Sequence, residues 1–199
     1  GEALKFRGGD IPTVTCGEWF VLDDGDLLVA EKLDAWALPN ALKAQARRDR
    51  ALAERLAVEK LAGSPAPKLS GDVLLNTDKP PTWATLRGKP VLLVLLDFMQ
   101  PSFVPLVPPL LAFHEMYGKQ GLVIIGVHAK GSREEIEKRL TEEKMTFPVL
   151  IDDGKNEERF GIGFSACILI DREGKVVSVY KDVLAPPAEI EKLLDEKDR

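Results

Sequence analysis

The chain has 199 residues, of which 45% are hydrophobic and 30% are charged, the composition of one globular domain with a small appendage. Its 27 basic and 32 acidic residues are mixed along the sequence and leave a formal net charge of −5, which argues against a nucleic-acid surface and a polybasic membrane face. No apolar run reaches the roughly 20 residues of a membrane-spanning helix, so we expect no direct membrane insertion.

The first residue and the two cysteines of the chain bear on its processing and its redox chemistry. It begins with Gly1 instead of Met, which indicates a processed or trimmed protein and leaves its location open. Cys16 and Cys167 are far apart and form no C-x-x-C pair, so we expect neither a local redox motif nor a zinc knuckle. A long-range disulfide between them stays open, but the favoured interpretation is two small buried side chains, because free cysteine is among the most buried residue types.

An N-terminal extension is predicted over residues 1–63. Two apolar runs, 14–22 and 27–33, flank an Asp-Asp-Gly-Asp sequence, and Asp-Gly between such runs is typical of a β-hairpin. A calcium loop is disfavoured because the later ligands and the terminal Glu of that pattern are missing. Residues 40–62 are rich in Ala, Leu, Glu, Lys and Arg, which predicts a helix. The prolines that follow forbid its continuation, so the main domain is expected over 64–199.

Apolar runs of strand length alternate with helical patterns along the main domain. The strands are expected at 91–96, 122–127, 148–151, 167–170 and 176–180, and the helices at 108–117, 133–144 and 188–196. Ser132 followed by Glu135 is a capping box that opens the second of these helices. Strands and helices in this order predict parallel β-α-β pairing, and hence an α/β sandwich with a mixed sheet.

Five short sequences in this domain point to a known fold. They are "SPAPKLSG", "TLRGKPVLLVLL", "YGKQGLVIIGVHAKG", "FPVLIDDG" and "ILIDREGKVV". Together they resemble the redoxin branch of the thioredoxin-like proteins, which includes thiol:disulfide reductases and peroxiredoxins, over about residues 63–194. The resemblance implies a thioredoxin-like three-layer α/β sandwich and a location outside the cytoplasm, such as the periplasm. It is specific for the fold and not for an activity.

The resemblance also implies catalytic positions, and this chain has no cysteine at any of them. The W-C-x-x-C cysteines of the reductases fall at about Gln100 and Phe103, within "QPSF", and the peroxidatic cysteine of the peroxiredoxins falls near Leu106. Disulfide exchange needs one thiolate to attack and a second thiol to resolve the mixed disulfide. The cis-proline of the family falls at Ser165, where a cis bond would cost about 2.5–4 kcal/mol, so we expect a trans bond and a remodelled loop.

The other candidate residues lie near these vacated positions. Cys167 is the alternative catalytic thiol, although as the first residue of a strand it is expected in the core. Ser102 is interpreted as a turn or cap residue, because without a neighbouring base its hydroxyl stays protonated. His128 ends a strand, where α/β sheets bind ligands, but a metal site would have to recruit further ligands such as Asp97 or Asp152, so we expect no metal.

An apolar, proline-rich segment stands where the reactive motif would be. If exposed, it favours a protein or peptide partner at the vacated active-site face, and its prolines suit a preorganised docking loop. The predicted ligand or partner contacts are Phe98, Met99, Ser102, Phe103 and His128. We therefore predict a thioredoxin-fold domain that has lost thiol redox activity, needs no cofactor, and acts as a binding or structural module. The alternatives are a thiol-disulfide oxidoreductase or peroxiredoxin-like antioxidant protein that uses Cys167, and a small-ligand or metal site around His128.

Overall fold

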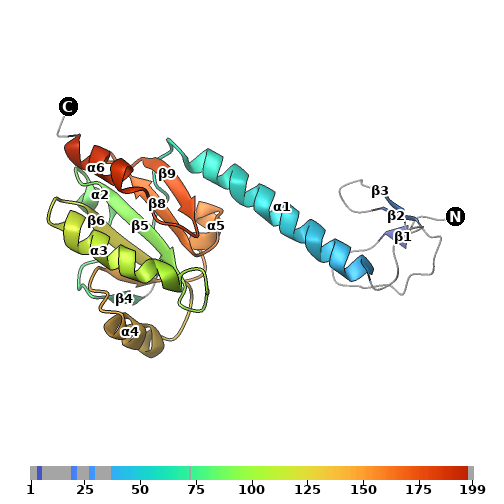
Figure 1. Ribbon diagram of the computed structural model, residues 1–199, viewed down its shortest axis with the longest axis horizontal. Coiled ribbons are helices and arrows are strands. Elements are labelled where there is room, and N and C mark those ends of the chain that lie inside the picture. The colour runs from blue at the N-terminus through green and yellow to red at the C-terminus, as the bar shows by residue number, and fades with distance from the viewer. Residues whose placement is uncertain (1–3, 6–18, 22–26, 30–36, 72, 197–199) are drawn as a thin grey trace. The chain divides into compact units, whose positions relative to one another are not determined.

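The computed structural model of the chain describes residues 4–5, 19–21, 27–29, 37–71 and 73–196 (Figure 1). The chain divides into two compact units, residues 1–53 and 54–199, and the boundary falls within the long helix α1 (Ala37–Leu61). The boundary predicted from the sequence, at residue 63, directly follows this helix. None of the helices in the described part of the chain is long and apolar enough to cross a lipid bilayer.

The first unit contains a small sheet in the order β1-β2-β3. Its strands are β1 (Leu4–Lys5), β2 (Trp19–Val21) and β3 (Leu27–Val29). β2 and β3 are antiparallel, with Phe20 opposite Leu28, so the two predicted hairpin strands pair as expected. The parallel strand β1 was not predicted. The predicted Asp-Gly turn and Cys16 lie outside the described residues.

A mixed sheet of six strands in the order β4-β7-β6-β5-β8-β9 forms the centre of the second unit (Figure 1). The strands are β4 (Val73–Leu75), β5 (Val91–Leu96), β6 (Val123–His128), β7 (Val149–Ile151), β8 (Ala166–Ile170) and β9 (Val176–Lys181). β5, β6 and β7 are parallel, whereas β4, β8 and β9 run antiparallel to their neighbours. All six residues of β5 are buried, because this central strand is covered on both faces.

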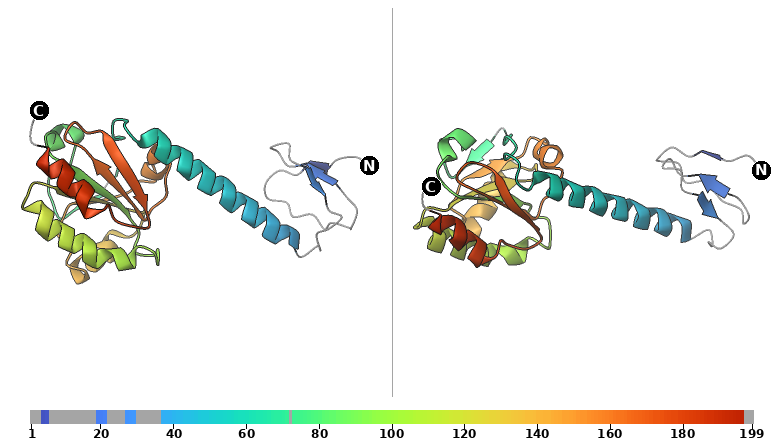
Figure 2. Two further views of the ribbon diagram at one scale, coloured as in Figure 1. Left: turned by 45° about the horizontal axis from the view of Figure 1, so that its top comes forward. Right: turned by 90° about the horizontal axis from the view of Figure 1, so that it is seen from above.

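Helices cover both faces of the sheet. They are α1, α2 (Trp83–Leu86), α3 (Val107–Gly118), α4 (Arg133–Glu142), α5 (Asn156–Phe160) and α6 (Pro187–Asp195). Side chains of α3, α4 and α6 share one buried cluster with Leu92 and Leu96 of β5, and the end of α1, α2 and α5 share the other with Leu93 and Leu95. Figure 2 shows α3 and α6 on one side of the sheet and α2 on the other. The predicted three-layer α/β sandwich is confirmed.

Besides β1 and a 3₁₀ turn at Val104–Leu106, the sequence analysis missed the short elements β4, α2 and α5. Each of the latter has three to five residues, which is too short for a hydrophobic period to appear in the sequence. The predicted cap of α4 is present, since the Ser132 hydroxyl accepts a hydrogen bond from the Glu135 N–H at 3.5 Å. The same hydroxyl donates to the Glu134 carboxylate at 2.8 Å, which differs from the predicted reciprocal bond with Glu135.

Candidate functional site

Gln100 and Phe103, the two positions that the resemblance assigns to the reductase cysteines, lie in residues 97–103, the loop that leaves β5 at the carboxyl end of the parallel strands. Leu96, His128 and Ile151 are paired side by side there, which is the edge where open α/β sheets bind ligands. The loop is a chain of tight turns. Asp97 accepts hydrogen bonds from the Met99 N–H on its carboxylate at 2.9 Å and from the Gln100 N–H on its carbonyl at 3.0 Å.

The loop then passes directly into helical structure. The Phe103 N–H donates to the Gln100 carbonyl at 3.0 Å, and the Leu106 N–H donates to the Phe103 carbonyl at 2.8 Å. A single turn of 3₁₀-helix, η2 (Val104–Leu106), follows and leads into α3. Prolines restrict the backbone at one position of the loop and at three positions of the helical turns after it. These prolines are Pro101, Pro105, Pro108 and Pro109.

The predicted contact residues of the loop differ sharply in exposure. The Met99 side chain is 87% exposed, Gln100 and Ser102 are exposed, and Phe98 is half-buried. Phe103 is 0% exposed and packs its ring edge-on against Phe98, with 6.0 Å between the ring centroids. The prediction that Phe103 contacts a partner directly does not fit this burial, because its ring is part of the core beneath the loop.

Ser102 and Ser165 form a hydrogen-bonded pair across the vacated site, with 3.1 Å between their hydroxyl oxygens. Ser165 is buried, and no described peptide bond is cis, which fits the trans bond expected at this position. Its φ of 71° lies in the left-handed region, which is uncommon for a residue other than glycine. Its N–H donates to the Leu95 carbonyl and its carbonyl accepts from the Asp182 N–H, both at 2.7 Å. Two backbone hydrogen bonds therefore hold Ser165 in this left-handed conformation.

The buried ring of His128 contacts the loop at Phe98. Its Nδ1 lies 2.6 Å from the Ala129 carbonyl, its Nε2 lies 3.4 Å from the Phe98 backbone nitrogen, and its ring centroid is 5.0 Å from that of Phe98. Burial lowers the pKa of His128, while the bond to Ala129 and the nearby Asp97 carboxylate oppose that shift. Because its side chain is only 5% exposed, a direct contact between His128 and a partner, as predicted, does not fit the structure.

A metal site was weighed at this edge of the sheet. The Asp152 carboxylate accepts a hydrogen bond of 2.7 Å from the Asn156 amide, so it serves a buried structural network. Among the described residues, no group of three or more His, Cys, Asp and Glu side chains lies close enough together to hold a metal ion.

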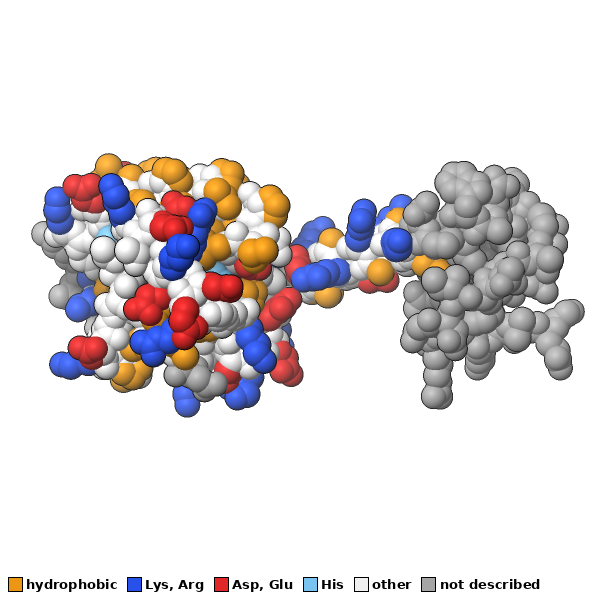
Figure 3. Space-filling view, turned by 90° about the horizontal axis from the view of Figure 1, so that it is seen from below, with side chains coloured by type: hydrophobic (Ala, Val, Ile, Leu, Met, Phe, Trp, Pro, Cys, Tyr) orange, Lys and Arg blue, Asp and Glu red, His pale blue; other side chains and the backbone are white. Residues whose placement is uncertain are grey.

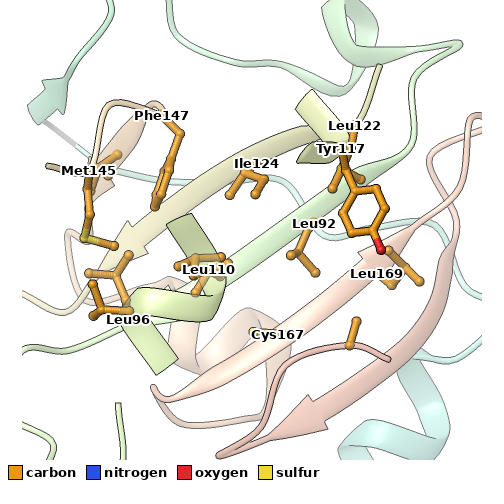
Figure 4. Packing of buried hydrophobic residues seen from close by; sticks show 14 of the residues in the cluster. Leu92, Leu96, Leu110, Tyr117, Leu122, Ile124, Met145, Phe147, Cys167 and Leu169 are labelled. Atoms are coloured by element: carbon orange, nitrogen blue, oxygen red, sulfur yellow. The ribbon is translucent and has the colours of Figure 1, made fainter. Parts of the chain in front are cut away.

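Cys167 lies in the interior of the sheet. It is paired with Val94 of β5 and Tyr180 of β9, is 1% exposed, and carries a free thiol. Figure 4 shows it within the hydrophobic cluster that contains Leu92, Leu110 and Leu169. Burial raises the pKa of Cys167 to about 12, which leaves a thiolate fraction of only about 10⁻⁵ at neutral pH. The expectation that Cys167 is a core residue is confirmed.

The exposed face of the site is defined here as the loop surface, made of Met99, Pro101, Ser102 and Val104. Figure 3 shows hydrophobic side chains gathered on one side of the second unit among scattered charged ones.

Comparisons with known proteins agree with this architecture. No protein-family model and no curated protein matches the chain. Among solved structures, a thioredoxin-like superfamily protein covers 67% of this chain and 97% of its own, with 24% identity and a TM-score of 0.60. A thiol-disulfide isomerase from Corynebacterium glutamicum covers 66% and 97%, with 24% identity and a TM-score of 0.58. A putative thiol:disulfide interchange protein DsbE from Chlorobium tepidum covers 66% and 92%, with 22% identity and a TM-score of 0.54.

These likenesses establish the class of fold. The chain has a thioredoxin-like fold, which confirms the resemblance seen in the short sequences of the main domain. At identities below 25% the likeness carries the fold alone, so the activities named for those proteins do not transfer directly to this chain.

Proposed function

We propose that this thioredoxin-like domain does not exchange disulfides and serves instead as a binding or structural module. The observation that carries the proposal is the position of Cys167, the described thiol of the fold, in the sheet interior with its pKa raised to about 12. An attacking thiol must be both ionised and accessible, and Cys167 is neither. An oxidoreductase or antioxidant activity of Cys167 would therefore require the sheet to open.

The replacement of the reactive motif supports the binding part of the proposal. Met99 and Val104 expose apolar surface on a loop whose turns are held by Asp97 and whose underside rests on buried Phe103. A rigid apolar surface loses little conformational entropy on binding, which suits a protein or peptide contact. A location outside the cytoplasm belongs to the same proposal and is supported by the resemblance to the redoxin branch.

Thiol titration tests the redox part of the proposal in a Cys16→Ser background, where Cys167 is the remaining cysteine. At pH 8 the thiolate fraction of Cys167 is about 10⁻⁴, so we expect labelling by an aromatic disulfide reagent only after denaturation. The matched control is Ser102→Cys in a Cys16→Ser, Cys167→Ser background, which puts a thiol on the exposed loop and should react rapidly in the native protein. Rapid native labelling of Cys167 would refute the proposal.

Turnover gives the second readout. We expect the wild-type chain to reduce insulin disulfides no faster than the reductant alone, and the Cys167→Ser variant to behave identically. A wild-type rate above that background which disappears in Cys167→Ser would show that Cys167 is catalytic.

Site-specific photocross-linking tests the binding part. A photoreactive side chain at Met99 should give a discrete protein adduct in the native host cells, while the same probe at Lys138, on the exposed face of α4, should not. Equal adducts from both positions would contradict a partner at the loop surface.

A further inference from the structure

We propose that His128 is a pH-sensitive latch for the loop of residues 97–103, holding the loop closed while its ring is neutral and loosening it when the ring is protonated. The inference goes beyond the proposed function, since it concerns how the loop surface changes shape. It rests on the hydrogen bonds of the ring, so it holds whether or not the loop surface has a partner.

The two contacts of the ring determine which nitrogen carries the proton. A backbone carbonyl only accepts hydrogen bonds, so Nδ1, at 2.6 Å from the Ala129 carbonyl, must be the donor. In a neutral ring Nε2 then carries the lone pair, and it faces the N–H of Phe98 at 3.4 Å. The Phe98 amide is thereby attached to the end of β6 through the neutral form of the ring alone.

Protonation removes this attachment. When Nε2 gains a proton, it becomes a donor that points at the Phe98 N–H, itself a donor, so the hydrogen bond is replaced by repulsion. The Phe98 amide must then turn away or find another acceptor. Phe98 is the second residue of the loop, and its ring packs on both His128 and Phe103. A rotation of the Phe98 amide would therefore move the start of the loop.

The charged groups around the ring act in both directions. The Asp97 carboxylate favours the protonated ring. The Oδ1 of this carboxylate accepts the Met99 N–H at 2.9 Å, so attraction of the carboxylate toward the charged ring would also act on the first turn of the loop. This arrangement links the proton on His128 to the backbone at Met99.

Two further groups come from the elements packed nearby. Arg139 of α4 lies over the Phe98 ring, with its guanidinium carbon 5.9 Å from the ring centroid, and its positive charge disfavours a second positive charge on His128. Arg139 also forms an ion pair with Glu143 at 2.8 Å. Directly after β7, the Asp152 N–H donates to the His128 carbonyl at 2.8 Å, and the Asp152 carboxylate accepts a hydrogen bond from Asn156. Burial disfavours the charged ring as well, so the latch is expected to release below the ordinary histidine range.

Nuclear magnetic resonance of the full-length, ¹⁵N-labelled chain tests the latch, because the chain contains only two histidines, His114 and His128. Between about pH 8 and pH 5 we expect the backbone amides of Phe98 and Met99 to shift with the same midpoint as the His128 ring nitrogens, below 6.5. Once corrected for the intrinsic effect of pH, hydrogen exchange at Phe98 should be about tenfold faster in the protonated state.

Variants separate the latch from general acid effects. His128→Gln should abolish the coupled amide shifts, whereas the matched control His114→Gln should keep them. Should His128→Gln fail to fold, Asp97→Asn gives the same information, because removal of the carboxylate should move the His128 midpoint further down. The proposal would be overturned if the amide chemical shifts of Phe98 and Met99 did not follow the titration of His128, or if they still changed with pH in His128→Gln. Neither result bears on the thiol and cross-linking tests of the proposed function.

Discussion

Truncation of Phe103 tests whether the vacated cysteine position has become part of the core. The ring is fully buried in the cluster that includes Leu96, Val107 and Leu110. Phe→Ala at such a site costs about 3–5 kcal/mol, from lost transfer free energy and the cavity left behind. With a urea m-value of about 2 kcal/mol/M, a cost of about 4 kcal/mol lowers the unfolding midpoint by about 2 M. That cost is a large share of the roughly 5–15 kcal/mol that stabilises a domain.

The matched control lies four residues away in the same loop. Met99→Ala should change the free energy of unfolding by less than about 0.5 kcal/mol, because the side chain is 87% exposed. Should Phe103→Ala prevent folding altogether, Phe103→Leu keeps most of the volume and should cost about 1–2 kcal/mol. Urea unfolding followed by circular dichroism measures all three variants. Equal midpoints for Phe103→Ala and Met99→Ala would refute the assignment of Phe103 to the core.

Three further predictions concern buried polar groups. Asn156→Ala should cost about 2–4 kcal/mol in urea unfolding, since it leaves the Ser70 N–H and carbonyl without their side-chain partner and removes one of the two hydrogen bonds that residue 156 donates to the Asp152 carboxylate; a cost below about 1 kcal/mol would contradict this. Ser165→Pro should cost more than about 3 kcal/mol by the same measurement, because proline fixes φ near −65° and lacks the N–H that Leu95 accepts, and a neutral result would contradict the observed loop. The lowered pKa of His128 means that the unfolded chain binds the proton more tightly, so stability should fall as the pH drops below about 6.5 and be level above it. Unfolding curves over a pH series should show that this component is missing in His128→Gln.

The sequence predicted the centre of the fold well because its strands are buried on both faces. Residues 91–96 are all apolar and all buried, and an uninterrupted run of this length is typical of a covered parallel strand. The edge strand β4 and the short helix α5 could not be found in this way, since tertiary pairing with β7 and the Asn156 network stabilise them. Their stability comes from residues distant in sequence.

The sequence predicted which residues occupy the candidate site, but only partly which of them are exposed and which contact one another. The absence of cysteine at Gln100 and Phe103 is evident from the residues alone, but nothing in the sequence distinguishes exposed Met99 from buried Phe103, since both are large and apolar. The hydroxyl pair of Ser102 and Ser165 joins positions 63 residues apart in the sequence. The left-handed backbone of Ser165 could not be predicted either, because this conformation is uncommon for residues other than glycine.

Because of these arrangements, we expect that cysteines introduced at positions 100 and 103 would not create disulfide exchange. Of the two positions that correspond to the cysteine pair, Gln100 is exposed whereas Phe103 fills the core, so a cysteine at each would place one thiol in solvent and the other beneath the loop. The proline position is closed as well, because Ser165 holds a backbone conformation that proline cannot adopt and uses its N–H to bind β5. The resemblance to the redoxin branch implies a cysteine pair and a proline loop that lie opposite each other. Here the same two segments are joined by the hydrogen bond between the Ser102 and Ser165 hydroxyls, which favours a closed surface over an open one.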